Sequence, residues 1–299
     1  MNVSVVVPTL NDREELRGCL DAIAAENPYE VVVVNGPSTD GTSGMVRDRT
    51  DVDVLVEIDE RNVNVSRNAG LDRVRGDAVG FVSPTMAVEP GWLDAVTVAL
   101  EKAAAVTGPT HERLDTGVAT DTAESRRIRG RTVTYFNGGN VAFSTELATT
   151  LDGFDEYLGI GGARDAAHRI AGLGHEVAWS ADMCVSREAA ADGGTTERDW
   201  RMRYRSLSYR LAKNYGIYPT VPLRTLRHAI ADAGGGVRDV ARGDAKPTSW
   251  IGNGRDVVLG GGRGYADGLR ARYADRSPRR NSRGVSSRAD RAVAVHDRR

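Results

Sequence analysis

A single acidic side chain, Asp40, lies in a loop of small residues that directly follows an apolar strand. The loop spans residues 35–42 (NGPSTDGT), and the four valines Val31–Val34 come immediately before it. Four β-branched apolar residues in a row are typical of a strand that is buried on both faces of a parallel sheet. Open α/β sheets bind their ligands at the carboxyl ends of such strands. The sequence therefore predicts a nucleotide pocket that presents Asp40.

The elements that would position this loop alternate between strand and helix. Expected strands are 3–7, 31–34, 52–56 and 78–82, and expected helices begin near residues 11 and 42 and span 64–74 and 92–106. This alternation is the signature of βαβ units around a parallel sheet. No G-x-G-x-x-G sequence follows the first strand, which argues against a dinucleotide-binding dehydrogenase.

The pattern changes after about residue 108. We expect a polar surface segment (109–130), strands (131–136, 140–143, 175–180) and helices (163–173, 198–214). The predicted organisation is a principal domain over residues 1–220, a helical, glycine-rich appendage over 221–275 and a basic tail over 276–299.

Composition narrows the class of protein. No run of 18 apolar residues is present, so no segment is expected to span a membrane. The first eight residues lack the basic region of a signal peptide, and two cysteines fit a reduced, cytoplasmic protein better than a disulfide framework. The tail holds eight arginines against two aspartates, which is typical of a disordered segment. We expect no nucleic-acid partner.

Six short motifs occur in an order that resembles the family 2 glycosyltransferases. They are VVVPTLN (5–11), PSTDGT (37–42), SRNAG (66–70), GWL (91–93), NGGN (137–140) and GFDE (153–156), within residues 2–215. The resemblance implies the GT-A fold, in which helices flank a mostly parallel, Rossmann-like central sheet. It also implies the inverting transfer of a single sugar from a nucleotide-sugar donor to a glycan or lipid-linked acceptor.

The resemblance assigns the donor side of the site to several polar residues. It implies that Thr9 and Asn11 border the nucleotide, that Asp40 accepts a hydrogen bond from the base, and that Arg67 and Asn68 lie near the diphosphate or the sugar. The alternative for Asp40 is a helix cap, and for the other two a solvated helix face. The acceptor side is expected to include Asn137, Gly139, Asn140 and Arg164.

One departure from the family concerns the metal. The family's Asp-x-Asp pair, which holds Mg²⁺ or Mn²⁺ on the donor diphosphate, is replaced here by Ser83-Pro84-Thr85. Hydroxyls are poor ligands for hard cations, so we assign no metal ligands, leave the cofactor open and keep Ser83 and Thr85 on the donor side. A positive group must then counter the diphosphate, unless a displaced carboxylate holds the metal. The candidates are Arg67, Arg164, Arg201, Arg203 and Arg205 for the first case, and Asp59, Glu60 and Glu89 for the second.

A second departure concerns the general base. When the family pattern is anchored on Arg169, its Glu-Asp pair falls on Gly162 and Ala163, and a later Asp falls on Asp165. An inverting transfer needs a base for the acceptor hydroxyl, so the resemblance makes Asp165 the candidate, with His168 as an assistant. The alternative for Asp165 is an ion pair with Arg169, four residues later on the same helix.

Other functions remain as alternatives. The lack of a Gln-x-x-Arg-Trp sequence argues against a processive polysaccharide synthase, and a nucleotidyltransferase would need a glycine-rich loop after the first strand. An amphipathic stretch from Leu223 to Val240 would suit peripheral contact with an anionic membrane at the cytoplasmic face. The alternative is a helix that packs on its own domain. The rival to a transferase is a non-catalytic relative that binds a nucleotide or glycan as a scaffold or regulator.

Overall fold

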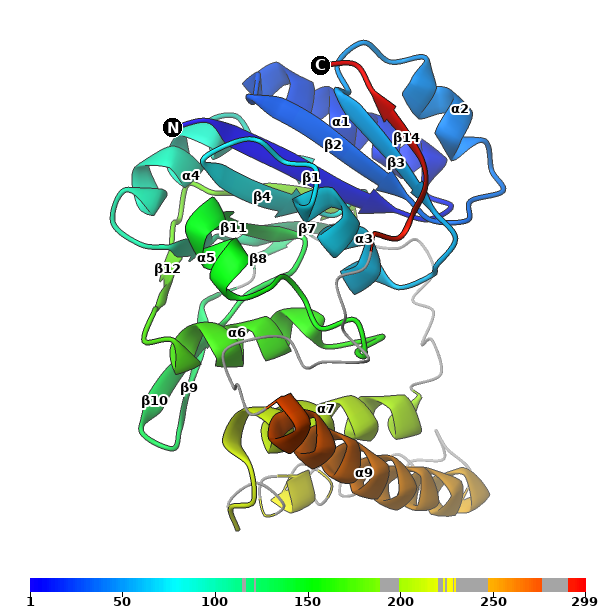
Figure 1. Cartoon of the computed structure of the whole chain (residues 1–299), viewed down its shortest axis with the longest axis vertical. Coiled ribbons are helices and arrows are strands. Elements are labelled where there is room, and N and C mark those ends of the chain that lie inside the picture. The colour runs from blue at the N-terminus through cyan, green and yellow to red at the C-terminus, as the bar shows by residue number, and fades with distance from the viewer. Residues whose placement is uncertain are drawn as a thin grey trace.

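An eight-stranded sheet forms the centre of the molecule (Figure 1). The computed structural model describes residues 1–114, 117–120, 122–188, 199–219, 223, 225–227, 229, 247–275 and 290–299. The strand order is β12-β6-β11-β4-β1-β2-β3-β14. The strands are β1 (Val3–Thr9), β2 (Glu30–Asn35), β3 (Val54–Ile58), β4 (Ala78–Val82), β6 (Ala105–Thr107), β11 (Asn140–Ser144), β12 (Val177–Trp179) and β14 (Ala292–Asp297).

The part of this sheet that β1 to β4 form is parallel. β1 pairs in parallel with β2 and β4, and β2 with β3, whereas β11 runs antiparallel to β4 and β6. Every residue of β1, β2 and β4 is buried, because helices cover both faces of the sheet. Gly80 in β4 allows a large side chain to approach: a Cβ there would lie 2.7 Å from the ring of Trp92. The predicted α/β sheet is therefore confirmed.

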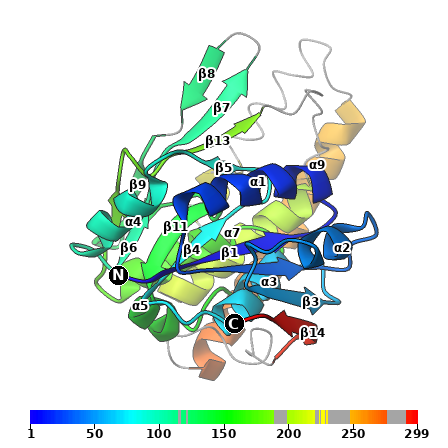
Figure 2. The ribbon, with the colours of Figure 1, turned by 90° about the horizontal axis from the view of Figure 1, so that it is seen from above.

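Helices form two layers around the sheet, as the view from above shows (Figure 2). One apolar layer includes side chains of α1 (Arg13–Glu26), α2 (Thr42–Arg47) and α4 (Trp92–Leu100). The other includes side chains of α3 (Val63–Leu71), α5 (Thr145–Thr150) and α6 (Gly162–Gly172).

The segment after α4 differs from the prediction. The helix expected over 92–106 ends at Leu100, because residues 105–107 pair with β11 and β12 as β6. The polar segment 109–130 is also largely strand. It contributes to a second sheet of order β5-β13-β7-β8 and to the β9–β10 hairpin. These strands are β5 (Ala87–Val88), β7 (Thr110–Leu114), β8 (Gly117–Thr120), β9 (Glu124–Ile128), β10 (Arg131–Tyr135) and β13 (Val185–Glu188).

Two long helices, α7 (Trp200–Tyr215) and α9 (Pro247–Asp275), pack against each other below the sheet (Figure 1). Their contact explains the glycines of the predicted appendage. A Cβ on Gly264 would lie 2.1 Å from the carbonyl oxygen of Arg205, and Gly260 and Gly268 approach α7 in the same way. Because these three glycines have no side chain, the backbones of the two helices can approach each other closely.

The end of the chain corrects the prediction of a wholly disordered tail. Residues 292–297 form β14, which pairs antiparallel with the outer edge of β3. The arginine-rich composition suggested disorder, but acids from distant parts of the chain neutralise these arginines. Arg291 pairs with Glu60 at 2.6 Å, and Arg299 pairs with Glu30. Residues 276–289 lie outside the described part of the chain.

Candidate active site

Two loops meet at the carboxyl ends of β1 and β2. The backbone N–H of Asn11 donates to Ser38 Oγ at 2.8 Å, and the side-chain oxygen of Asn11 accepts from the Thr39 N–H at 2.8 Å. Asn11 adopts a left-handed conformation (φ 57°), which asparagine tolerates better than most residues. These bonds hold the predicted nucleotide loop beside the end of β1.

Asp40 faces the same edge and makes three bonds. Its carboxylate accepts from the Arg13 N–H at 3.0 Å, from the Thr42 N–H at 3.1 Å and from Thr42 Oγ1 at 2.6 Å. The Thr42 hydroxyl is the main reason why the pKa of Asp40 lies below its usual range. The predicted helix-capping bond to the start of α2 is present. A carboxylate has about four acceptor positions, so Asp40 retains capacity for a ligand N–H.

Thr9 and Asn68, both predicted on the donor side, have mainly structural contacts. Thr9 is buried, and its hydroxyl donates to Asp12 at 3.3 Å, so it shapes the turn after β1 rather than lining an open pocket. Asn68 is also buried. It donates to the carbonyl of Phe154 and to Glu156, and it accepts from the Phe154 N–H at 2.8 Å. Asn68 therefore joins α3 to the GFDE segment and is not placed to touch a diphosphate.

Arg67, the neighbour of Asn68, has a different environment. Its Nη2 donates to the Gly138 carbonyl at 2.9 Å and its Nη1 to Asn64 at 3.2 Å, while its guanidinium stacks 5.0 Å from the ring of Phe154. Its Nε is buried and has no hydrogen-bond partner among the described residues. Burial lowers the pKa of Arg67 to about 10, so the group remains charged at neutral pH. An anion is the partner that such a donor lacks.

The NGGN loop touches the end of β4 next to Arg67. The Ser83 N–H donates to the Gly139 carbonyl at 3.1 Å, and a Cβ on Gly139 would lie 2.6 Å from the Cβ of Ser83. Asn137 accepts from the Gly139 N–H at 2.9 Å and closes the turn. Asn140, predicted on the acceptor side, is instead fully buried and accepts from the indole N–H of Trp92. Its role is structural.

The family's metal position does not fit a hard cation in this chain. Ser83 Oγ and Thr85 Oγ1 lie 3.1 Å apart, and both are neutral hydroxyls. Two of the three displaced carboxylates are engaged elsewhere: Glu60 pairs with Arg291 at 2.6 Å, and Glu89 lies 2.9 Å from His111. The third, Asp59, is exposed after β3. Mg²⁺ and Mn²⁺ favour carboxylate oxygens. We therefore derive no step through a metal at this loop.

Asp165 and His168 do not occupy positions suited to proton transfer with a substrate. Asp165 is fully buried and accepts from Lys213 at 2.8 Å, Arg169 at 2.9 Å and Asn214 at 2.8 Å. Burial opposes its ionisation, but the two cations outweigh burial and hold the pKa of Asp165 well below its usual range. The predicted ion pair with Arg169 is confirmed. A base this weak and enclosed is a poor acceptor of a substrate proton, so these contacts favour the ion-pair alternative over the catalytic assignment.

His168 lies in the core on the same helix. It is 1% exposed, and its Nδ1 is 2.8 Å from the hydroxyl of Tyr215. Its ring also makes edge contacts with Tyr135 and Tyr215. These contacts describe a packed core histidine rather than a catalytic one.

Arginines gather around the first turn of α6, and one of them was not predicted. Arg164 donates to Glu124 at 2.8 Å and lies 4.4 Å over the ring of Tyr135. Arg210, from α7, approaches Gly161 so closely that a Cβ there would lie 3.0 Å from its Nη1. Within the described part of the chain its buried Nε has no hydrogen-bond partner, and burial lowers its pKa to about 10. Arg67 lies near the same turn: a Cβ on Gly138 would lie 2.7 Å from its Nη2 and 3.1 Å from the Cβ of Ala163.

Other predicted arginines do not join this group. Arg205 bonds with the hydroxyl of Tyr157 and pairs with Asp267 of α9 at 3.6 Å. Arg203 lies 5.4 Å from the ring of Trp200, at the exposed start of α7. No sequence pattern marks Arg210, because its helix is expected to be amphipathic whether or not it meets α6. Only the packing of α7 on α6 identifies it.

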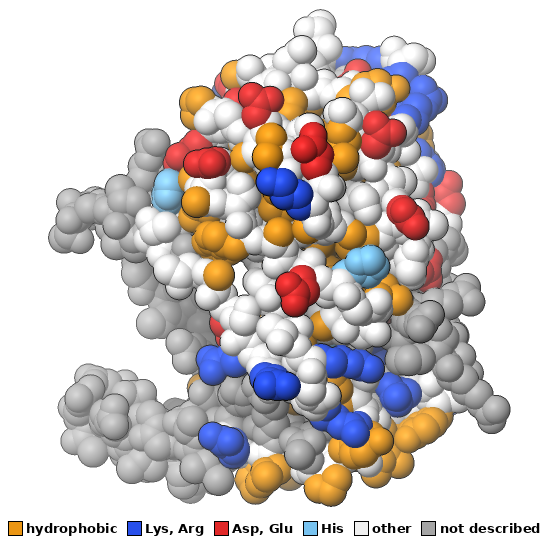
Figure 3. Space-filling view, turned by 90° about the vertical axis from the view of Figure 1, so that its left-hand side faces the viewer, with side chains coloured by type: hydrophobic (Ala, Val, Ile, Leu, Met, Phe, Trp, Pro, Cys, Tyr) orange, Lys and Arg blue, Asp and Glu red, His pale blue; other side chains and the backbone are white. Residues whose placement is uncertain are grey.

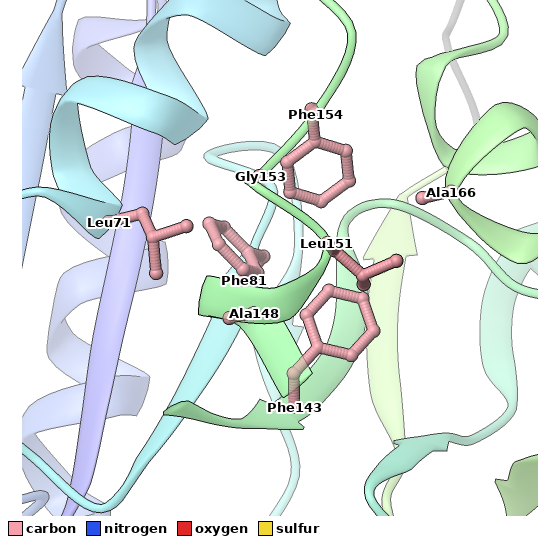
Figure 4. A pocket seen from close by; sticks show the side chains of 8 residues that line it. All are labelled: Leu71, Phe81, Phe143, Ala148, Leu151, Gly153, Phe154 and Ala166. Carbon is pink, nitrogen blue, oxygen red and sulfur yellow. The ribbon is translucent and has the colours of Figure 1, made fainter. Parts of the chain in front are cut away.

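An apolar cavity lies near this region but cannot hold a sugar. Phenylalanines from β4, β11 and the GFDE segment line it together with Leu71 and Leu151 (Figure 4). Its volume is about 10 Å³, which corresponds to roughly one water-sized sphere. Its walls lack the polar groups that water or a sugar requires, so we assign it to imperfect core packing.

Sequence comparison matches residues 4–147 to the family described as glycosyl transferase family 2. These residues, a little under half of the chain, resemble a family 2 glycosyl transferase domain. Curated relatives of the family 2 domain include glycosyltransferase AglE of Haloferax volcanii, 28% identical over 100 residues, and glycosyltransferase GlyA of Streptococcus pneumoniae, 29% identical over 99 residues. Each alignment covers 31% of this chain. The aligned residues make up 33% of AglE and 14% of GlyA. The match thus spans a third or less of these relatives.

Solved structures confirm the predicted GT-A fold over a larger part of the chain. A mannosyltransferase from Pyrobaculum calidifontis, solved with GDP-Man and Mn²⁺, superposes with a TM-score of 0.58 and 20% identity, covering 89% of this chain and 87% of that one. TarS of S. aureus superposes with a TM-score of 0.56 and 17% identity, covering 71% of this chain and 39% of TarS. In the described residues, no helix combines the length and apolar character required to cross a membrane.

Proposed function

We propose that this chain binds a nucleotide-sugar and transfers its sugar, with inversion, to a glycan or lipid-linked acceptor without a metal at the Ser83–Thr85 loop. The observation that carries the proposal is the unpartnered, charged Nε of Arg67 beside the NGGN loop of a family 2 domain. Structural neighbours were solved with GDP-Man or UDP-GlcNAc. These ligands support a nucleoside diphosphate sugar as the donor class.

In the proposed complex, Asp40 accepts from the base and Asn11 borders the nucleotide. Arg67 donates from Nε to the diphosphate, with Ser83 and Thr85 as neutral donors at the end of β4. Arg210 and the first turn of α6 add positive potential nearby. As the bond between sugar and phosphate breaks, negative charge grows on the leaving diphosphate. Fixed positive groups in a water-poor site stabilise that charge most strongly at the transition state.

The rival function is binding without transfer, and a specific observation favours it. Ala163 occupies the position of the family's acid, and Asp165 is enclosed in ion pairs. A scaffold or regulator that binds a nucleotide or glycan would keep the donor loops and lose the base. Measured turnover distinguishes the two functions, because both predict nucleotide binding.

An acceptor carried by a membrane is supported by one surface of the molecule. Ile217, Tyr218, Leu223 and Leu226 are all at least 44% exposed. The β9–β10 hairpin is rich in exposed arginine, and Arg129 stacks 3.1 Å from the ring of Tyr218. Apolar and basic side chains lie together at the lower end of the face in Figure 3. Such a combination suits an anionic lipid surface, so peripheral contact at the cytoplasmic face forms part of the proposal. Most of the amphipathic stretch predicted from Leu223 to Val240 lies outside the described residues.

Calorimetry with GDP, UDP and their sugar conjugates in EDTA tests donor binding. We expect binding of at least one nucleotide, a loss of at least tenfold in affinity in Arg67→Gln, and no loss in the control Arg61→Gln, an exposed arginine six residues earlier. No binding of any nucleotide by folded protein would overturn the proposal. Release of nucleoside diphosphate with acceptor present, at equal rates with and without EDTA, supports metal-independent transfer. Binding without any release, across donors and acceptors, supports the scaffold instead.

A further inference from the structure

Three side chains that commonly bind transition metals converge on the second sheet. Glu89 directly follows β5, His111 lies in β7, and Cys184 directly precedes β13, so a different strand positions each of them. One ligand atom from each lies within 4.8 Å of the other two. All three residues are half-buried, which leaves them open to an ion from solvent. None of them belongs to the donor loops described above.

The backbone of the sheet fixes the positions of these residues. The Glu89 N–H donates to the Cys184 carbonyl at 3.0 Å, and the neighbouring Val185 N–H donates to the carbonyl of Pro109 at 3.2 Å. The buried amide of Asn140 donates to the Met183 carbonyl at 2.9 Å and to the Pro109 carbonyl at 3.2 Å. The chain on either side of the three ligands is therefore held in place by hydrogen bonds.

The surroundings of the cluster are acidic. The Nδ1 atom of His111 lies 2.9 Å from a carboxylate oxygen of Glu89. Burial, followed by the charges of Glu89 and Asp182, raises the pKa of the Cys184 thiol. The thiol donates to the Ala181 carbonyl at 2.9 Å. A divalent cation would reverse the unfavourable effect of these charges on a thiolate.

We propose that Glu89, His111 and Cys184 bind a zinc-class transition metal ion, with a fourth position left to water. A set of one carboxylate, one imidazole and one thiolate suits Zn²⁺ and excludes Mg²⁺ or Ca²⁺, which require oxygen ligands. Zinc–ligand bonds of about 2.0–2.3 Å place tetrahedral ligand atoms roughly 3.3–3.8 Å apart. The present spacing, within 4.8 Å, has to shorten to that value when the ion binds. On binding, the thiol loses its proton to solvent and the sulfur bonds to the metal, with no redox change.

The ion would join β5, β7 and β13 at one point. Because Asn140 connects two of these strands to the NGGN loop, the metal would also stiffen the support of that loop. Metal binding at this site is measurable without any nucleotide or acceptor.

Titration of metal-stripped, full-length protein with Co²⁺ and Zn²⁺ tests the site. We expect one equivalent of Co²⁺ to bind with a thiolate-to-cobalt charge-transfer band in the near ultraviolet, and Zn²⁺ to displace it. Cys184→Ser should abolish the band, and Cys184→Ser and His111→Ala should each weaken Zn²⁺ binding at least tenfold. The matched controls are Cys19→Ala, which alters the other cysteine, and His175→Gln, which alters an exposed histidine. Both should bind Zn²⁺ as the unaltered chain does.

A second measurement covers the case in which a variant fails to fold. In the unaltered chain, iodoacetamide should modify the half-buried Cys184 and not Cys19, which is 1% exposed. Saturating Zn²⁺ should slow this reaction at least tenfold. An alkylation rate that Zn²⁺ leaves unchanged, or a charge-transfer band that persists in folded Cys184→Ser, would overturn the proposal.

Discussion

Replacement of Asp165 by asparagine removes one charge from a buried network without changing the shape of the side chain. The network pairs the carboxylates of Asp155 and Asp165 with the cations of Lys213 and Arg169. Each of these four side chains is at most 5% exposed. Lys213 contacts both carboxylates, at 2.5 Å and 2.8 Å. The substitution leaves two buried cations with one carboxylate.

The expected cost follows from what each cation retains. Breaking one partner of a buried ion pair costs about 3–5 kcal/mol. Lys213 keeps Asp155, and Arg169 keeps the carbonyls of Leu151 and Gly153. We therefore expect a loss near the lower limit, about 3 kcal/mol of unfolding free energy. For a chain of this size, that loss corresponds to a decrease of roughly 6–12 °C in Tm.

The same network predicts a pH dependence with a definite sign. The pKa of Asp165 is lower in the folded state than in the unfolded state, where it is about 3.9. Its contribution to stability is therefore complete above about pH 5 and is lost as the pH falls below the unfolded value. The difference in stability between the unaltered chain and Asp165→Asn should shrink in acid.

Chemical unfolding at pH 7 and pH 4, with turnover measured on the folded fraction, tests this reasoning. The control is Asp94→Asn, an exposed acid in the first turn of α4, which should change stability by less than about 1 kcal/mol. If folded Asp165→Asn retains full stability but loses turnover, Asp165 acts as the base and the structural interpretation is wrong.

Three further changes have expected outcomes. Gly264→Ala places a methyl group against a carbonyl of α7 and should lower the free energy of unfolding by about 1–3 kcal/mol. In the control Gly262→Ala, the added methyl group meets nothing within 4 Å and should stabilise α9 by up to about 1 kcal/mol. Thermal unfolding of both variants measures the difference. With both Ser83 and Thr85 replaced by Asp, Mn²⁺ should increase the affinity for nucleotide. Calorimetry with and without Mn²⁺ measures this, and an affinity that the ion leaves unchanged would contradict the prediction. Deletion of residues 290–299 should expose the edge of β3 and promote self-association, visible by size-exclusion chromatography with light scattering; a stable monomer would contradict this.

The sequence predicted the donor half of the fold because local pattern and tertiary role agree there. Val31–Val34 is apolar at every position, and a strand with both faces buried requires that. The helix predicted through residue 106 shows the opposite case. Its alanines favour helix, but pairing with β11 and β12 makes 105–107 a strand. Local propensity does not contain that information.

The contact of Asp40 with Thr42 at the start of α2 was predictable, because both residues lie in one loop. The site was not predictable where distant elements supply the partners. The burial of Asp165 depends on Lys213 and Asn214 from α7, and the approach of Arg210 to Gly161 depends on the same packing. Motif order indicated the family, but only side-chain contacts separate an enclosed acid from a catalytic one.

The pairing of β14 with β3 can form only late in the synthesis of the chain. β3 ends at Ile58, whereas its partner begins at Ala292. A ribosome adds about 5–20 residues per second, so the edge of β3 emerges on the order of 10–50 s before the strand that covers it. During that interval a row of unpaired backbone groups flanks the nucleotide loop. Unpaired strand edges of this kind favour pairing with other chains until β14 has been made.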